Sequence, residues 1–302
     1  MRPALRPGLL ATWRDRDTVQ LGVDARRAVA IAGMSQASDV IRLLDGSRDR
    51  DQVVTDAGRS GVPAAVTERV LTVLAAAGAL IDHPAELLRS LPAELRRLLM
   101  PVLTVASLSG QDSEGGARQL ARRKATTVVV TGLGPVATTI ADLLTRSGLA
   151  ARRAQPGAAG RADLSVLVGR QQPEHVAELV RTRQPHLAVL ASEAIGVVGP
   201  LVRPGSTACL RCLDLARAAR DPAWPLVLAQ IAGRDADPCG CDPILEAAVA
   251  AQAAAVVVAF ADGAPLALAA VNGTLELVLP AWQWRRRSWR PQPGCTCGSR
   301  AA

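Results

Sequence analysis

The sequence predicts an α/β fold in which a small α+β domain over residues 1–83 precedes a larger domain over residues 124–302 with a mainly parallel sheet. Short alternating and amphipathic stretches occupy the first domain, whereas strand and helix patterns alternate between residues 126 and 190, which favours a parallel sheet. All six cysteines lie in the last third of the chain. A length of 302 residues fits two domains of roughly 150 residues each.

The first domain begins with a β-hairpin pattern. Residues 12–23 read TWRDRDTVQLGV, an alternating stretch around a polar turn. The alternation places Val19, Leu21 and Val23 on one face. A short strand follows over residues 28–31.

Three helices and a return strand complete this domain. Each helical stretch is followed by a glycine, which is typical of a helix end. The helices and the strand are expected at residues 35–45, 49–57, 64–77 and 80–81. The third helix has one apolar face, which a small helical core alone would explain.

A hairpin, a strand, three helices and a return strand in about 80 residues look like a winged-helix module. Such a wing offers an unpaired strand edge to which an extended peptide can add, with its side chains reaching a neighbouring helix. We therefore expect peptide contacts at five residues of the hairpin and the third helix: Val19, Leu21, Val23, Thr67 and Val70.

The residues between the domains read as a helical linker. Residues 84–103 carry a helical pattern, and residues 107–119 have the Ser, Gly and charge content of a loop. We place the linker over residues 84–123.

The net charge of +8 is concentrated at the C-terminus, where residues 281–302 hold five Arg and no acidic residue. Residues 1–100 hold fourteen Arg against twelve acids, and residues 101–280 hold sixteen basic residues against fifteen acids. A chain that is almost neutral over most of its length lacks a general phosphate-binding face, which disfavours nucleic acid as a partner.

The sequence indicates a cytoplasmic protein without a membrane span. The first twenty residues contain only a three-residue apolar run, too short for a secretory signal. The longest apolar stretch, residues 244–260, contains Glu246 and Gln252. A buried core helix explains it better than a membrane-spanning helix does.

A glycine-rich loop opens the second domain. A buried strand over residues 127–131 leads into Gly132-Leu-Gly134-Pro-Val-Ala137, and a helix then continues to residue 146. This G-x-G-x-x-A pattern between strand and helix predicts a Rossmann-like unit in which Gly132, Gly134 and Ala137 would line a phosphate site. Nucleotide binding is nevertheless disfavoured, because Pro135 removes an amide donor and residues 150–159 hold no acid for a ribose.

Two further strand patterns support a parallel sheet. They cover residues 163–168 and 186–190, and a helical stretch over residues 173–183 separates them.

The six cysteines form three close pairs: Cys209 with Cys212, Cys239 with Cys241, and Cys295 with Cys297. Paired cysteines in a cytosolic chain indicate a metal site more strongly than a disulfide. Two alternatives stay open for the first and third pairs: reduced thiols without a function, and a redox-active pair.

The stretch Gly199-Pro-Leu-Val-Arg-Pro-Gly205, followed by Cys209-Leu-Arg-Cys212, resembles the zinc-binding stretch of the ThiF/MoeB superfamily of ubiquitin-activating-type adenylyltransferases. With the glycine loop upstream, the whole chain looks like a divergent branch of that superfamily. The branch comprises leader-peptide-binding partners of bacterial cyclodehydratases, whose N-terminus resembles the PqqD-like domain.

This resemblance implies a structural zinc ion held by two cysteine pairs, here Cys209 and Cys212 with Cys295 and Cys297. Four thiolates leave no open position for water. The third pair, Cys239 and Cys241, occupies the interval where sulfur-carrier activators of the superfamily have a reactive thiol. A surface loop shaped by Pro238, Gly240 and Pro243 is the favoured interpretation of that pair, and a role as competing metal ligands or as a disulfide stays open.

The chain departs from active members of the superfamily in its nucleotide site. It lacks their Asn-Arg motif, and Gly169 and Arg170 follow the strand where a magnesium-binding aspartate is expected. Lys124, the only lysine, precedes the first strand. Adenylyl transfer depends on positioned charges around the reacting phosphate, so we expect neither ATP binding nor catalytic residues.

The C-terminal stretch 274–290 alternates as one apolar strand and ends with Trp282 and Trp284 followed by three arginines. Interleaved Trp and Arg can stack nucleic-acid bases or form a protein contact. Because the stretch leads into a cysteine pair, a structural strand or a partner contact is favoured.

These observations lead to one hypothesis and two alternatives. The protein would bind the leader of a precursor peptide or a small protein, without catalysis, and present it to a YcaO-type or other modifying enzyme, and the superfamily resemblance also implies a homodimer as an option. It could instead be an active ATP-dependent adenylyltransferase that activates the carboxyl terminus of a small protein or peptide. A zinc-containing winged-helix DNA-binding regulator is the other alternative.

Overall fold

A computed structural model describes residues 2–25, 28–82, 92–109, 115–155, 162–231 and 241–298. The chain divides into two compact units, Met1–Ala121 and Arg122–Ala302. Helices and strands of both units form a mixed α/β structure, as the sequence predicts.

Unit 1 contains two small antiparallel sheets and a group of helices. The first sheet has the order β2-β3-β4, and the second pairs β1 with β5. The strands are β1 (Pro3–Leu5), β2 (Ala11–Trp13), β3 (Val19–Leu21), β4 (Val29–Ile31) and β5 (Leu80–Asp82). The helices are α1 (Ala37–Leu43), α2 (Arg50–Arg59), α3 (Ala64–Ala76), α5 (Ala93–Ser109) and the beginning of α6 (Ala117–Ala125).

Local sequence explains where the helices of unit 1 begin and end. Asp49 caps α2 with its carboxylate on the Gln52 amide, and the Gln52 side chain accepts from the Asp49 amide in return. The expected stop at Gly58 is wrong, since α2 continues to Arg59. The left-handed backbone that a glycine favours occurs instead at Gly61, with φ of 83°.

Helix α5, expected within the linker, contacts the rest of unit 1. The Arg6 guanidinium donates to the Ser107 carbonyl at 2.7 Å. A methyl group added at Gly8 would collide with the Thr104 side chain at 2.1 Å, so the two segments are closely packed. The helical pattern expected from residue 84 lies partly outside the described residues.

Unit 2 is built on a seven-stranded sheet with the order β12-β11-β10-β9-β8-β6-β7. Its strands are β6 (Thr127–Thr131), β7 (Ala150–Ala154), β8 (Leu164–Val168), β9 (His186–Ser192), β10 (Ile195–Val202), β11 (Gly273–Val278) and β12 (Gln283–Ser288). The strands β7, β6, β8 and β9 run parallel, whereas the pairings from β9 to β12 are antiparallel. The sheet is therefore mixed, and the parallel part that the sequence predicts is formed by β7, β6, β8 and β9.

The C-terminal stretch 274–290 forms a hairpin and not the single strand we expected. It reverses between β11 and β12 after the cis peptide bond Leu279–Pro280, and Trp282 in the turn has a positive φ of 50°. An X-Pro bond and a left-handed residue are both typical of tight turns.

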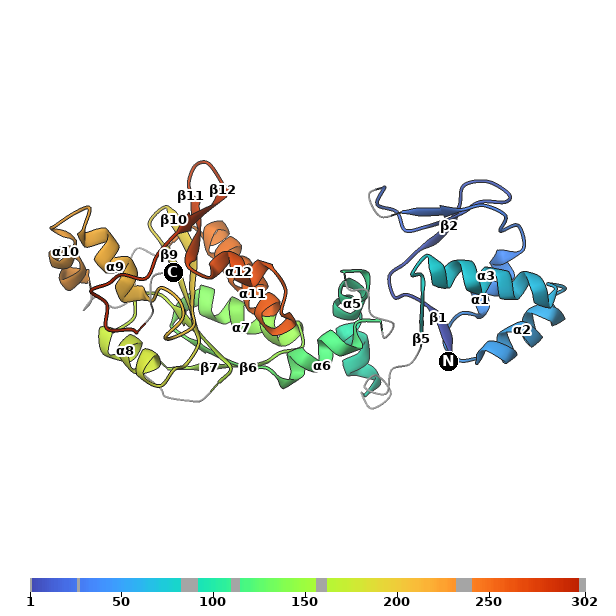
Figure 1. The fold of residues 1–302 in the computed structure, drawn as a ribbon, viewed down its shortest axis with the longest axis horizontal. Helices are drawn as coiled ribbons and strands as arrows, with labels where there is room; N and C mark the ends of the chain where they lie inside the picture. The colour runs from blue at the N-terminus through green and yellow to red at the C-terminus, as the bar shows by residue number, and fades with distance from the viewer. Residues whose placement is uncertain are drawn as a thin grey trace. The chain divides into compact units, whose positions relative to one another are not determined.

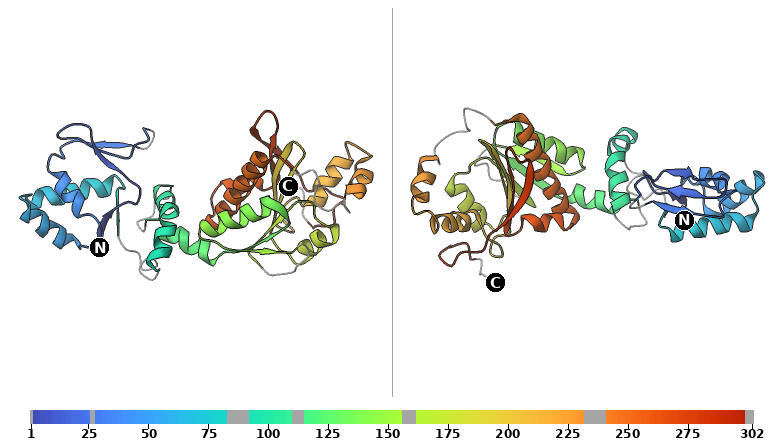
Figure 2. Two further views of the ribbon diagram at one scale, coloured as in Figure 1. Left: turned by 180° about the vertical axis from the view of Figure 1, so that it is seen from behind. Right: turned by 90° about the horizontal axis from the view of Figure 1, so that it is seen from above.

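Helices cover both faces of this sheet (Figures 1 and 2). On one face lie α7 (Gly134–Arg146), α11 (Pro243–Asp262) and α12 (Leu266–Ala270), and on the other lie α8 (Pro173–Arg181), α9 (Leu210–Ala218) and α10 (Trp224–Ile231). Within the described ranges α11 is the helix long and apolar enough to cross a membrane. Eight of its residues are buried, which supports its assignment as a core helix.

A histidine is enclosed in the core of unit 2. His186 is fully buried between Ser165 of β8 and Val202 of β10. Its Nδ1 lies 3.0 Å from the Gln184 carbonyl oxygen, and its Nε2 has no hydrogen-bond partner among the described residues. Burial lowers the pKa of His186 to about 4, so the imidazole is neutral in the folded protein at pH 7.

We expect this histidine to make unit 2 sensitive to acid. Below pH 6.5 the unfolded chain protonates His186 while the folded chain does not, so the free energy of unfolding should fall by about 3 kcal/mol between pH 6.5 and pH 4. Urea unfolding across this pH range measures the effect. The variant His186→Gln should lose this part of the pH dependence, and an unchanged pH dependence in the variant would contradict the assignment.

Candidate functional site

Four cysteines from distant parts of the chain meet at one point of unit 2. Cys209 precedes α9, Cys212 lies in its first turn, and Cys295 and Cys297 come from the C-terminal segment. Their four sulfurs lie within 4.8 Å of one another. The structure thus brings together the two cysteine pairs that the sequence singled out.

The sulfur positions fit a tetrahedral metal ion. Sγ of Cys209 lies 3.8 Å from that of Cys212 and 3.6 Å from that of Cys295, and Sγ of Cys212 lies 3.7 Å from that of Cys297. Four sulfurs about 2.3 Å from one zinc ion at tetrahedral corners lie about 3.8 Å apart. The cluster can therefore hold a metal ion without rearrangement, and its thiol donors suit zinc or iron.

The surroundings of the cluster suit a closed, structural site. Cys209 and Cys212 are buried, and Cys295 and Cys297 are half-buried. Burial raises the pKa of the Cys209 thiol well above its ordinary value and that of Cys295 to about 11. A bound cation must displace these protons. The backbone N–H of Gln292 donates to the Cys212 sulfur, with the nitrogen 3.4 Å from it. Such a contact supports a thiolate ligand.

Cys241, of the third cysteine pair, is not part of this cluster. Cys241 lies directly before the N-cap of α11, and its thiol donates to the Glu193 carbonyl at 3.7 Å. Cys239 lies outside the described residues.

The glycine loop joins β6 to α7, where the sequence places it. Gly132 has a φ of 133°, and a Cβ there would lie 2.5 Å from the Val168 carbonyl oxygen. Gly132 therefore allows the ends of β6 and β8 to approach closely. Gly134 has a φ of 81° and open space around it. Ala137 is fully buried in the core, so its expected role in contacting a cofactor is wrong, and it serves helix–sheet packing instead.

Side chains at this loop are bonded to the protein itself. Arg153, on β7, donates to the Thr138 hydroxyl at 3.0 Å and to the Gly132 carbonyl at 3.4 Å. The Gln171 amide donates to the Val168 carbonyl at 3.0 Å. Sequence reasoning missed Arg153, although the two arginines of β7 stand where an acid for a ribose is expected.

Four of the five expected peptide contacts are wrong. Val19, Leu21, Thr67 and Val70 are all buried inside unit 1, so their side chains cannot line a surface. Val23 is 70% exposed but lies beyond the end of β3. The expected edge is also wrong, because β3 is the central strand and pairs with both β2 and β4.

The strand edge that lies beside α3 belongs to β4. The described residues pair β4 with β3 on one side and with no strand on the other. Val29 is 41% exposed and Ala30 is exposed, whereas Ile31 faces the core. A Cβ added at Gly33, just after β4, would lie 3.1 Å from the guanidinium of Arg69 on α3. An unpaired strand edge thus ends beside a helix.

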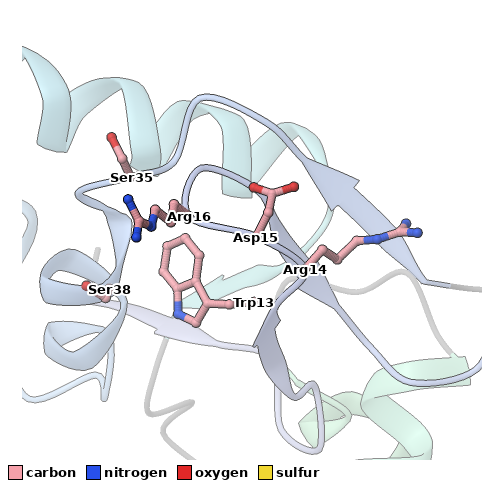
Figure 3. Close-up of a pocket in the computed structure, with 6 residues that line it drawn as sticks. All are labelled: Trp13, Arg14, Asp15, Arg16, Ser35 and Ser38. Carbon is pink, nitrogen blue, oxygen red and sulfur yellow. The ribbon is translucent and has the colours of Figure 1, made fainter.

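A shallow depression of about 430 Å³ lies at the turn between β2 and β3, beside the start of α1. Figure 3 shows the side chains of Trp13 and Arg16 facing two serines near the start of α1, whereas Arg14 points away from them. The residues that line it are Trp13, Arg14, Asp15, Arg16, Ser35 and Ser38.

No protein-family model and no curated protein matches this chain. Solved structures do match it. The heterocyclase TruD is 18% identical with a TM-score of 0.66, and the match covers 99% of this chain and 43% of TruD. A heterocyclase in complex with substrate and cofactor is 16% identical with a TM-score of 0.67, and the match covers 99% of this chain and 39% of that one.

MccB of E. coli, solved with MccA-N7isoASN, is 15% identical with a TM-score of 0.60, and the match covers 99% of this chain and 100% of MccB. The chain therefore spans less than half of either heterocyclase but the whole of MccB. These likenesses show a shared fold, and they agree with the ThiF-like fold that the sequence resemblance implies for the larger domain.

Proposed function

We propose that this protein captures a precursor peptide during the biosynthesis of a ribosomally made, modified peptide, and presents it to a separate modifying enzyme. Unit 1 acts as a winged-helix-like, PqqD-like recognition domain, and unit 2 as a degenerate ThiF-type domain. The protein works in the cytoplasm. The observation that carries the proposal is the open edge of β4 beside α3.

The peptide adds to β4 as a further strand. Backbone hydrogen bonds along an open edge bind an extended peptide of many sequences, and contacts with exposed side chains provide selectivity. Val29 and the exposed surface of α3 around Arg69 supply those contacts. Solved structures of the same fold contain MccA bound to MccB and a heterocyclase with its substrate, which supports a peptide ligand here.

The glycine loop takes no part in catalysis. Three features support this view. The ends of β6 and β8 pack on each other at Gly132, and Arg153 donates to the Gly132 carbonyl. Pro135, in the first turn of α7, has no backbone N–H to donate. An adenylyl transfer site needs free donors and a metal-binding acid around the phosphates. Residues 132–134 and 169–171 hold no acidic side chain where the superfamily has its metal-binding aspartate.

The modifying enzyme is a separate protein of the YcaO cyclodehydratase type. The fold shared with the heterocyclase TruD supports this class of partner. The four-cysteine cluster holds zinc, which fixes the C-terminal segment to α9.

Peptide capture can be tested by selecting peptides that bind the immobilised full-length protein from a randomised display library. We expect Val29→Asp to weaken binding of the selected peptides by about tenfold or more, because a buried valine contact contributes about 1.5 kcal/mol. The matched control is Leu10→Asp, since Leu10 is 59% exposed beside β2. Failure to select any peptide, or an equal loss of peptide affinity in both variants, would refute the β4 edge as the binding site.

A further inference from the structure

The strand β12 forms one end of the seven-stranded sheet of unit 2. The described residues pair it with β11 on one side and with no strand on the other. The turn that joins the two strands projects from the unit (Figures 1 and 2). Five of the six residues of β12 are exposed. An open strand edge of this kind can accept an extended segment of another chain through backbone hydrogen bonds.

Arg286, the middle one of three consecutive arginines in β12, is used by the fold itself. Its guanidinium donates to the Ala269 carbonyl at 2.9 Å and to the Val271 carbonyl at 3.1 Å. These bonds hold the end of α12 and the residues after it against the sheet. Arg286 is therefore not available to a partner.

Arg285 and Arg287 lie on the other face of β12, because side chains alternate along a strand. The Arg287 guanidinium is positioned by the ring of Trp289, whose centre lies 4.4 Å from it. Within the described part of the chain Arg285 has no hydrogen-bond or ion-pair partner. Glu276, directly opposite Arg285 on β11, accepts from the Thr274 hydroxyl instead. The edge thus presents two exposed guanidinium groups on one face, about 7 Å apart along the strand.

The charge of this edge selects among the chains that could pair with it. Residues 281–302 hold five arginines and no acidic residue. A second copy of β12, paired antiparallel over the arginines, would set arginine opposite arginine, which is destabilising. A nucleic acid would need exposed aromatic faces for its bases, but Trp284 packs against the core and Trp289 is 5% exposed. Charge complementarity favours an acidic polypeptide segment.

The turn beside this edge adds an exposed aromatic side chain. Trp282 is 42% exposed, and its φ of 50° lies in the left-handed region that bulky residues rarely adopt. The backbone at this position suits glycine better than tryptophan, and an exposed indole contributes little to the core. A contact between Trp282 and a partner explains both observations.

We propose that β12 binds an extended segment of a partner protein that carries two acidic residues at alternate positions. The segment adds to the open edge as a further strand. Its two carboxylates then face Arg285 and Arg287, and an apolar residue nearer the turn contacts Trp282. This edge belongs to unit 2 and is distinct from the β4 edge of unit 1, so the proposal does not depend on peptide capture.

The test measures the binding of synthetic fluorescent peptides to the full-length protein by fluorescence anisotropy. The probe peptide alternates glutamate with threonine and carries a leucine at one end. The reference peptide has the same composition but adjacent glutamates, so only one carboxylate can face the two arginines. We expect the alternating peptide to bind about threefold to fivefold more tightly, and its affinity to fall as salt is added.

Charge reversal at Arg285 tests the pairing directly. Arg285→Glu should weaken binding of the alternating peptide by about tenfold, because an attraction is replaced by a repulsion. The same variant should prefer a counterpart peptide in which one glutamate is lysine. The matched control is Arg152→Glu, an exposed arginine on β7 at the opposite end of the sheet. It changes the net charge equally and should leave the affinity unchanged.

Trp282→Gly separates binding from folding. Glycine suits a φ of 50°, so the free energy of unfolding should stay equal or rise while peptide affinity falls by about threefold. Four results would overturn the proposal: no binding of the alternating peptide, equal affinity for both glutamate peptides, equal effects of Arg285→Glu and Arg152→Glu, or tighter binding of a single-stranded oligonucleotide. Lower stability of Trp282→Gly with unchanged affinity would remove Trp282 from the site.

Discussion

Replacing Cys212 with serine is expected to abolish metal binding and to lower the free energy of unfolding of unit 2 by about 4 kcal/mol or more. Cys212 is fully buried, and its sulfur lies 3.8 Å from that of Cys209 and 3.7 Å from that of Cys297. Three remaining ligands bind a metal ion more weakly, and the C-terminal segment then loses its link to α9. Metal analysis and guanidinium unfolding measure both effects.

The matched control for this substitution is Cys241→Ser, which lies outside the cluster. We expect that variant to keep one metal ion per chain and near-normal stability. Full metal content in Cys212→Ser, or equal stability of the two variants, would show that the cluster is not a structural metal site.

Replacing Gly132 with alanine is expected to destabilise unit 2 by about 3 to 5 kcal/mol. The new methyl group would lie 2.5 Å from the Val168 carbonyl oxygen, a backbone atom, and the φ of 133° is accessible mainly to glycine. The ends of β6 and β8 would have to separate. Chemical unfolding followed by circular dichroism measures the loss.

The second glycine of the loop provides the comparison. In Gly134→Ala the added Cβ would have no atom within 4 Å, so the variant carries only the backbone strain of the positive φ of 81°. We expect it to lower the free energy of unfolding by about 1 to 2 kcal/mol. A similar loss of unfolding free energy in both variants would contradict the view that Gly132 serves strand packing.

Much of the local structure could be predicted from periodicity. The strand expected at residues 127–131 is β6, and the helix expected at 64–77 agrees with α3 to within one residue. A buried apolar run is typical of a core strand, and a glycine after an apolar helical face, here Gly78, is typical of a helix end. The hairpin around residues 12–23 was also predicted, since the polar turn between β2 and β3 is plain in the sequence.

The order of the strands could not be predicted in the same way. Strand β10 was missed because Gly196, Gly199 and Pro200 are typical of loops. Packing explains two of them: a Cβ at Gly196 would meet Val249 of α11 at 2.2 Å, and one at Gly199 would meet the Gly273 carbonyl at 2.6 Å. These are long-range contacts that local patterns do not reveal.

The peptide site was misplaced for a related reason. Alternation at Val19 and Leu21 identifies an apolar face, and such a face is buried by the protein's own helices before it is available to a ligand. The pairing of β3 with both neighbours leaves β2 and β4 as the edge strands of this sheet, and β4 is the one that ends beside α3. The cysteine cluster could be predicted because the pair spacings and the family resemblance both pointed to the same four residues.

The most direct test of peptide capture without nucleotide chemistry is isothermal titration of the zinc-loaded protein with a selected peptide, in the presence and absence of magnesium-ATP. We expect saturable heat for the peptide, the same affinity with and without nucleotide, and no heat for magnesium-ATP alone. Saturable binding of magnesium-ATP, accompanied by ATP–pyrophosphate exchange when peptide is present, would contradict this account and identify the protein as an active adenylyltransferase.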